Sequence, residues 1–323
     1  MNYKRLYIIG NGFDIHHGIN SKYSQFKEWL EDNQDEYNAL YLLYNHFHVD
    51  GDFWYDFENS LSKFNISEFA ENETHKNYPD FTSDHFAREW DKPIYQSEQD
   101  FVRIADEIKY AFHDWICSLN SPNPRKQLNL HTGDSFFINF NYTKTLEDLY
   151  HISTSRICHI HGCVDTDESF ILGHGEEVVS ESSSSDELPD YCDTSEKIEA
   201  FYDSHYDPVL DNVTETIVNG VNTFLKKDVQ SNIDNHYDMF HNLNQLEEIH
   251  VYGWSFSSID TPYLDEILQN NDMSRLHWII SWHIENDKVN ANKFLGKYRV
   301  ETNHTSFVQL DDLMDKSQLL LLF

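Results

Sequence analysis

The feature that most constrains the fold is an apolar run near the N-terminus that ends abruptly at two glycines. Residues 6–9 are Leu-Tyr-Ile-Ile, and Gly10-Asn11-Gly12 follows directly. The pattern predicts a buried strand that enters a tight loop. Glycine has no Cβ and accepts positive φ, so such a loop lets the backbone approach a ligand closely. The spacing is shorter than the full G-x-G-x-x-G pattern, and an ordinary strand-to-helix turn explains it equally well.

The charge of the chain argues against nucleic acid as a partner. Its 323 residues include 56 acidic and 23 basic side chains, a formal net charge of −33. Such a surface repels phosphate, and no basic stripe is present. The short pair Lys226-Lys227 is interpreted as a solvated helix end.

The sequence also predicts a cytoplasmic protein without a membrane segment. No apolar run reaches the roughly 18 residues that a spanning helix needs. The first residues lead into the predicted strand and lack the apolar core of a signal peptide. The four cysteines form no C-x-x-C pair, which is typical of reduced thiols rather than a disulfide framework.

The pattern of apolar residues and turn formers predicts the remaining elements. Strands are expected at residues 6–9, 135–140, 156–160, 170–172, 248–252 and, as the last one, 276–282. Helices are expected at residues 21–31, 36–47, 52–64, 97–119, 145–150 and 260–268, and in much of 195–245. Residues 65–95 are expected to form loops or short pieces, and 180–190 a mobile acidic loop.

This order of elements predicts an α/β fold, Rossmann-like, with a mainly parallel sheet. The chain is interpreted as a single domain, residues 1–323, with helical insertions at about 21–130 and 192–245. Ligands of such sheets bind beyond the carboxyl ends of the strands. Glycine, amide or imidazole groups follow five of the predicted strands: Gly10-Asn11-Gly12, Asn141-Tyr142, His161-Gly162, Gly173-His174-Gly175 and Gly253-Trp254-Ser255.

An ordered set of motifs resembles the AbiH family of phage abortive-infection proteins. The motifs are I-I-G-N-G-F-D-I-H-H-G-I-N-S-K-Y-S-Q-F, F-W-Y-D-F-E, F-I-N-F-N-Y-T-K-T-L-E, I-H-G, I-L-G-H-G and V-Y-G-W-S-F-S-S-I-D. They cover most of the chain. A thinner set, the first glycine loop, Asn-Tyr, His-Gly and the late Gly-x-Ser, resembles the sirtuin-like NAD-binding fold.

The sirtuin-like resemblance implies a role for particular residues. Gly10, Asn11 and Gly12 would line the dinucleotide phosphates, and Phe13 and Asp14 of the same loop would also belong to the cofactor site. Asn141, with Tyr142 beside it, would orient the nicotinamide ribose and a water molecule, and His161 would act as the base. Gly253 and Ser255 would contact the adenosine half, and Asp260 matches an acidic residue that often follows this loop in defence relatives.

Two departures from the sirtuin pattern shape the expected activity. Thr143 stands where sirtuins have an aspartate, and the chain has no four-cysteine zinc module. The resemblance therefore implies simple cleavage of NAD, as substrate, rather than protein deacylation. Breaking the nicotinamide–ribose bond calls for a neutral imidazole base and an amide that holds water, which His161 and Asn141 would supply.

Alternatives stay open at this stage. Asn141 and His161 also fit a capped strand end with a structural histidine, and Asp14 either bonds its own loop or faces the ligand. Trp254 and Tyr142 fit core packing. His159 and His161 have a spacing that suits a metal, with His16, His17 and His174 as further ligands, although no metal is expected.

The sequence leaves three candidate functions. The first is an NAD-cleaving antiphage hydrolase, the second a nucleotide sensor without turnover, and the third a metal-dependent nuclease or phosphohydrolase. The expected partners are a small-molecule nucleotide and, for regulation, a second copy of the chain or a phage-derived trigger.

Overall fold

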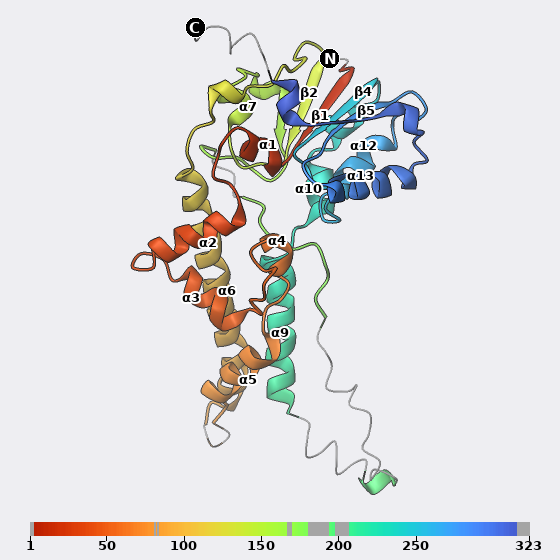
Figure 1. Cartoon of the computed structure of the whole chain (residues 1–323). Coiled ribbons are helices and arrows are strands. Elements are labelled where there is room, and N and C mark those ends of the chain that lie inside the picture. The colour runs from red at the N-terminus through yellow and green to blue at the C-terminus, as the bar shows by residue number, and fades with distance from the viewer. Residues whose placement is uncertain are drawn as a thin grey trace. The chain divides into compact units, whose positions relative to one another are not determined.

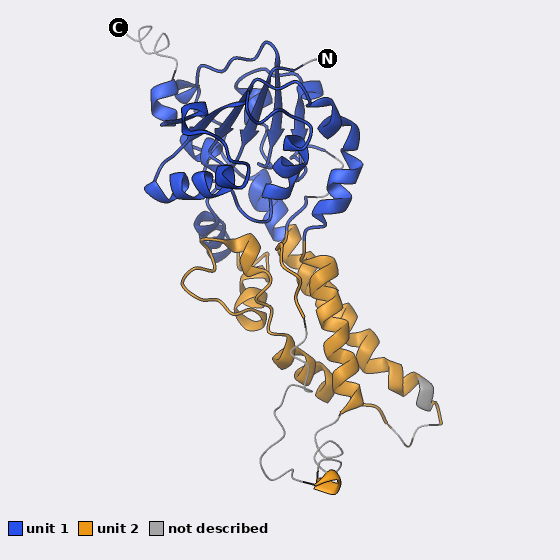
Figure 2. Cartoon of the chain, turned by 90° about the vertical axis from the view of Figure 1, so that its right-hand side faces the viewer, with its two compact units in different colours: residues 1–32, 111–172, 227–323 blue, residues 33–110, 173–226 orange. Residues whose placement is uncertain are grey.

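The chain forms two compact units, which we treat separately. The computed structural model describes residues 3–80, 82, 84–166, 170–179, 194–197 and 207–314. The sheet unit, unit 1 in Figure 2, comprises residues 1–32, 111–172 and 227–323. The helical unit, unit 2 in Figure 2, comprises residues 33–110 and 173–226. The interpretation of the whole chain as one domain with two insertions stays a prediction.

The sheet unit is built on a six-stranded sheet in which all neighbouring strands are parallel (Figure 1). Its strands are β1 Arg5–Ile9, β2 Ser135–Asn139, β3 Ile157–His159, β4 Glu248–Tyr252, β5 His277–Ser281 and β6 Thr305–Val308. The order across the sheet is β3-β2-β1-β4-β5-β6, which reverses direction between β1 and β4. This is the order of a doubly wound sheet, so the predicted α/β fold with parallel strands is confirmed.

Helices cover both faces of this sheet. Those of the sheet unit are α1 Asn11–His16, α2 Tyr23–Asp32, α7 Thr145–Asp148, α10 Val229–Asn235, α11 Tyr237–Asn242, α12 Thr261–Leu268 and α13 Glu285–Lys297. Short 3₁₀ turns lie at η1 Pro124–Lys126, η2 Thr154–Arg156, η4 Thr302–His304 and η5 Leu310–Leu313. Helices α12 and α13 lie on one side of the sheet and α1 and α7 on the other (Figure 1).

In strand β1, residues 6–9 are buried on both faces of the sheet. Leu6 and Ile8 point into a core shared with α12 and α13, whereas Tyr7 and Ile9 point into a second core shared with α1 and α7. Alternate side chains of a strand face opposite sides of the sheet, so the buried part of a strand that is covered on both faces is mainly apolar rather than alternating.

The helical unit contains α3 Ala39–His46, α4 Phe57–Ser60, α5 Ile66–Lys76 and α9 Pro208–Phe224. The helix α6 Phe86–Cys117 begins in this unit and ends in the sheet unit. Helix α5 packs on α9. Gly220 of α9 permits a close helix contact, because a Cβ at that position would lie 2.8 Å from the ring of Phe101 on α6.

Several predicted elements differ from the structure. Residues 65–95 are not mainly loops, since they contain α5 and the first turns of α6. Pro93 lies inside α6 and does not end it. Of the helix predicted at 52–64, only α4 is helical, and turns precede it.

The strand predictions also need two corrections. Residues 170–172 form no strand; Ile171 donates its N–H to the oxygen of His161 at 2.9 Å, without a ladder around it. The strand predicted at 276–282 is β5 but not the last, because β6 follows it. The half-buried sequence of β6, Thr-Ser-Phe-Val, is too short and polar for a clear strand signal. The predicted acidic loop at 180–190 lies outside the described residues.

The structure also bears on the predicted absence of a membrane segment and on the state of the cysteines. Within the described ranges, no helix is long and apolar enough to cross a bilayer. Cys117, Cys158 and Cys163 are free thiols, the first exposed and the other two buried.

Candidate functional site

The predicted site residues lie at one edge of the sheet. Ile9 of β1 is in register with Asn139 of β2 and Tyr252 of β4, and Asn139 is in register with His159 of β3. These strands are parallel, so the loops that follow them leave from the same edge. The first glycine loop, Asn141, His161 and Gly253 therefore all lie at the carboxyl end of the sheet.

The two glycine loops, after β1 and after β4, pack directly against each other at the point where the strand order reverses. The N–H of Gly12 donates to the oxygen of Gly253 at 2.8 Å, and the N–H of Gly10 donates to Tyr252 at 3.0 Å. A Cβ on Gly253, whose φ is +67°, would lie 2.0 Å from the nitrogen of Phe13. Glycine is required here because backbone meets backbone.

This packing bears on the predicted phosphate contact. The N–H of Phe13 donates to the oxygen of Gly10 at 2.9 Å, so both Gly12 and Phe13 already have acceptors within the protein. A phosphate would reach these donors only after the two loops separate. The nucleotide-binding role of residues 10–14 therefore stays a prediction that requires a different loop arrangement.

Asp14 is buried and faces the loop after β2. Its carboxylate accepts hydrogen bonds from the hydroxyls of Thr143 at 2.5 Å and Thr145 at 2.7 Å. Burial raises the pKa of Asp14 to about 6, although these hydrogen bonds oppose the shift. Asp14 thus bonds a neighbouring loop, which neither of its two predicted roles described. Thr143, the departure from the sirtuin pattern, is one of its donors.

Asn141 is also buried, and its side chain joins two loops. Its amide nitrogen donates to the oxygen of Gly10 at 3.1 Å, and its own N–H donates to the side chain of Asn139 at 3.1 Å. The amide therefore holds the loop after β2 against the loop after β1. To orient a water molecule on a substrate, it would have to release Gly10.

His161 lies in a second buried cluster, with two charged partners. Its Nε2 lies 3.3 Å from Oδ1 of Asp260 and 3.4 Å from Nζ of Lys227, and Lys227 lies 3.5 Å from the same oxygen of Asp260. The side chains of His161 and Lys227 are 2% and 0% exposed, so bulk water is excluded from the pair. We call these three residues the charged cluster.

The electrostatics of the charged cluster favour an ionised carboxylate. Burial alone would raise the pKa of Asp260, but the charges of Lys227 and His161 outweigh that effect and hold it below its ordinary value. Oδ1 of Asp260 nevertheless has no hydrogen bond of good geometry within the described residues. Nε2 of His161 has one role at a time: it donates to Asp260 when protonated, and it accepts from Lys227 when it is not.

Lys227 was missed by the sequence analysis, which interpreted it with Lys226 as a solvated helix end. Lys226 fits that interpretation better, because it is partly exposed and pairs with Glu177, whose side chain is exposed. Lys227, the next residue, is buried beside Asp260. Nothing in the sequence indicates which of the two adjacent lysines is buried. The path of the chain after α9 decides it.

Asn141 and His161 are close, but their side chains belong to different networks. The ring of His161 lies 5.4 Å from that of Phe140 and 6.2 Å from that of Tyr142, the two neighbours of Asn141. The predicted proximity at adjacent strand ends is therefore present. The predicted pairing of the two side chains around one sugar requires a rearrangement of Asn141.

The other predicted contacts divide between core and surface. Tyr142 packs against Phe170 with ring centroids 4.8 Å apart, and Trp254 against Phe140 at 5.2 Å, both buried. These aromatic side chains lie in the core, as the packing alternative predicted. Ser255 is exposed.

The histidines considered as metal ligands have other partners. Nε2 of His159 lies 2.8 Å from Oε1 of Glu147, and the ring of His17 bonds the oxygen of Phe13 and the hydroxyl of Tyr150, each at 2.7 Å. In the part of the chain that the structure describes, no group of three or more histidine, cysteine, aspartate or glutamate side chains is arranged to hold a metal ion.

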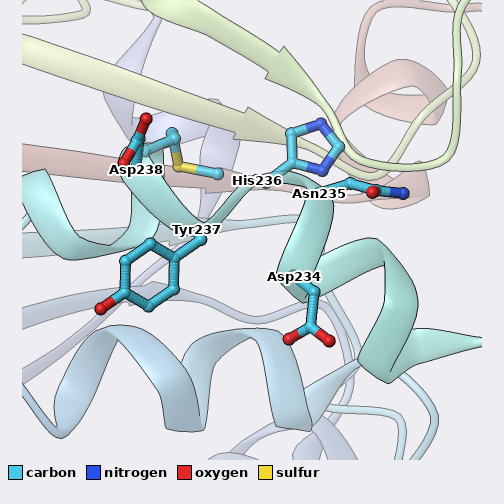
Figure 3. Close-up of a pocket in the computed structure, with 6 residues that line it drawn as sticks. Asp234, Asn235, His236, Tyr237 and Asp238 are labelled. Atoms are coloured by element: carbon cyan, nitrogen blue, oxygen red, sulfur yellow. The ribbon is translucent and has the colours of Figure 1, made fainter.

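A surface hollow of about 340 Å³ lies at the junction of α10 and α11 (Figure 3). Its lining is a single continuous segment, residues 234–239, in which Figure 3 shows the side chains of Asp234, Tyr237 and Asp238 around the turn between the two helices. None of the predicted site residues borders it. In the charged cluster, His161 and Lys227 are buried, whereas the side chain of Asp260 is 13% exposed.

Fold and site together define a class: an α/β protein with a doubly wound parallel sheet and a buried histidine–aspartate–lysine cluster at its carboxyl edge. Within that class, residues 6–282 match the family model described as Bacteriophage abortive infection AbiH. The chain belongs to this family and is an abortive-infection protein of antiphage defence. No curated protein and no solved structure matched the chain, so the sirtuin-like resemblance stays a prediction.

Proposed function

We propose that this AbiH protein is a hydrolase that cleaves the nicotinamide–ribose bond of NAD during abortive infection, with His161 as the base. One observation carries the proposal. A histidine, a carboxylate and an ammonium group meet within 3.5 Å of one another at the carboxyl edge of a doubly wound sheet. That edge is where such sheets bind nucleotides.

Each member of the charged cluster has a role in the proposed reaction. A water molecule attacks C1′ of the ribose as the bond from C1′ to the nicotinamide nitrogen breaks, and ADP-ribose and nicotinamide are formed. His161 takes the proton that the water loses, and Asp260 stabilises the resulting imidazolium. Lys227 keeps Asp260 ionised and adds a positive charge that favours an anionic nucleotide.

The arrangement of the loops is consistent with an inactive state of the proposed hydrolase. His161 and Lys227 are buried, and Gly12 is bonded to Gly253 across the point where the strand order reverses. A hydrolase that destroys NAD has to be inactive before infection. We propose that a signal of infection separates the loops after β1 and β4, which admits substrate to the charged cluster and frees the donors on residues 12 and 13.

The test is the NAD content of cells that express the chain, measured by chromatography before and during phage infection. We expect NAD to fall and nicotinamide to appear only in infected cells, and His161→Asn to abolish both changes while the melting temperature of the purified variant stays within a few degrees. His113→Gln is the matched control, because His113 is an exposed histidine of the same unit.

The outcomes separate the candidate functions. If infected cells abort phage growth while NAD stays constant, the proposal is wrong. Calorimetry with NAD and ADP-ribose then decides whether the protein is a sensor that binds without turnover. Chelators test the metal-dependent alternative, since the proposed hydrolysis by His161 is insensitive to them.

A further inference from the structure

The helical unit contains a groove between α3 and α5 that has no role in the proposed reaction. Its volume is about 230 Å³. Tyr41 and Asn45, one turn apart on α3, form one wall, and Glu68 and Asn72, one turn apart on α5, form the other. All four residues are exposed, so the groove is open to a partner.

The floor of the groove is aromatic and firmly held. The ring of His46 lies 5.3 Å from that of Phe69 and 6.1 Å from that of Phe64, and the backbone of Asn65 donates to the oxygen of His46 at 2.8 Å. Burial lowers the pKa of His46, so this ring is neutral at pH 7. The floor therefore contributes no positive charge.

Because His46 is neutral, the charge of the groove lining comes from Glu68. The side-chain nitrogen of Asn65 lies 3.3 Å from its Oε2, and its charge opposes the lowering of the pKa of His46 without cancelling it. Within the described residues, no lysine, arginine or histidine forms an ion pair with it. A carboxylate exposed in this way has acceptor capacity left for a cationic donor.

The walls match one kind of cation particularly well. A guanidinium group is planar, donates up to five hydrogen bonds and stacks on aromatic rings. Glu68 offers a carboxylate, Asn45 and Asn72 offer amide oxygens, and the ring of Tyr41, 69% exposed, offers a face for a cation–π contact. A groove of this volume accommodates one arginine side chain.

The charge of the helical unit indicates where that arginine comes from. Residues 33–110 and 173–226 contain 30 acidic and 8 basic side chains, a net charge of −22 out of −33 for the chain. Such a unit attracts a basic polypeptide and repels both nucleic acid and a second copy of this acidic chain. We propose that the groove between α3 and α5 binds an arginine side chain of a basic polypeptide partner.

The experiment uses the full-length protein and three synthetic peptides, acetyl-Gly-Arg-Gly-Arg-Gly-amide and the same peptide with citrulline or with lysine in place of arginine. Binding is measured by calorimetry at physiological salt. We expect the arginine peptide to bind, and Glu68→Gln to weaken binding by about three- to tenfold, as for an exposed charge-assisted pair. The citrulline peptide, which lacks the charge, should not bind.

Glu71→Gln is the matched control, because it removes the same charge from an exposed position of α5 outside the groove. We expect less than a twofold change. Equal weakening by Glu68→Gln and Glu71→Gln would overturn the proposal, because it would show diffuse attraction only. Binding of the citrulline peptide, or equal binding of the lysine peptide, would overturn the assignment to arginine.

Discussion

Two carboxylates at the same edge of the sheet, the buried Asp14 and the largely buried Asp260, are stabilised in opposite ways. Asp14 accepts two hydroxyl hydrogen bonds, at 2.5 and 2.7 Å, and its pKa is raised to about 6. Asp260 faces two nitrogen groups, at 3.3 and 3.5 Å, and its pKa is lowered. At Asp14 the neutral donors do not offset the loss of hydration of the carboxylate, whereas at Asp260 the nearby cations do.

The difference separates a carboxylate that joins two loops from the carboxylate of the charged cluster, to which we assign the proposed reaction. Around Asp14, hydroxyl and amide donors satisfy the carboxylate and tie the loops after β1 and β2 together. Around Asp260, charges are concentrated, and Oδ1 has no well-aligned donor among the residues that the structure describes. Nε2 of His161 has two competing partners, Asp260 and Lys227. Charged groups with incompletely satisfied hydrogen bonds are typical of functional sites.

The largest expected effect comes from Lys227→Met. Removing the ammonium group leaves Asp260 and His161 buried without it, and breaking a buried ion pair from one side costs about 3–5 kcal/mol. We expect the free energy of unfolding, measured by urea denaturation, to fall by that amount. The double variant Lys227→Met with Asp260→Asn should recover most of the loss.

Lys226→Met provides the control for that experiment. Lys226 is the adjacent lysine, and its partner Glu177 has a side chain that is 61% exposed. Surface pairs contribute at most about 1 kcal/mol. Similar losses for Lys226→Met and Lys227→Met would contradict the special role of the charged cluster.

The second effect is a pH dependence of stability that differs between the two carboxylates. The pKa of Asp14 is raised from 3.8 to about 6, so between these values the folded state holds a proton that the unfolded state has lost. The stability that this proton contributes is present below pH 3.8 and is lost as pH rises to 6, by about 3 kcal/mol. For Asp260, whose pKa is lowered, stability is present above the ordinary pKa and is lost on acidification below it.

The measurement compares unfolding free energies of the wild type and Asp14→Asn between pH 4 and pH 7. Asparagine resembles the protonated carboxyl, so the wild type should lose about 2 kcal/mol relative to the variant over this range, because part of the total is already lost at pH 4. Parallel curves for the two proteins would show that Asp14 titrates normally.

The smallest effect is expected from Thr145→Val, which removes one hydroxyl donor from Asp14 and keeps the shape of the side chain. The loss of one buried hydrogen bond should lower the free energy of unfolding by about 1–2 kcal/mol. Thr145→Ser keeps the hydroxyl and should change it less. If valine is tolerated as well as serine, the hydroxyl does not support Asp14.

Much of the sheet was predictable from the sequence. Strands β1, β2, β4 and β5 are apolar segments bounded by turn formers, and their buried pattern is visible without tertiary information. Residues at their carboxyl ends, such as Asn141 and His161, could therefore be placed at a common edge. β6 and α5 were missed because their sequences are polar and half-buried, which weakens any periodic signal.

The partners of the site residues were not predictable in the same way. Asn141 was expected beside His161 around a ligand, but its amide is bonded to Gly10. Lys227 was expected in solvent and lies beside Asp260. These contacts join residues far apart in the chain, and no local pattern encodes them.

The sequence by itself determined the α/β class, the mainly parallel sheet and the edge at which its polar loops gather, because the apolar pattern and turn chemistry are local properties of the chain. Only the tertiary structure decided that the glycines of two loops pack on each other, that one of two adjacent lysines is buried, and that His161 meets Asp260. The reason is physical: burial and charge pairing depend on which distant segments meet, and that is settled by packing of the whole unit.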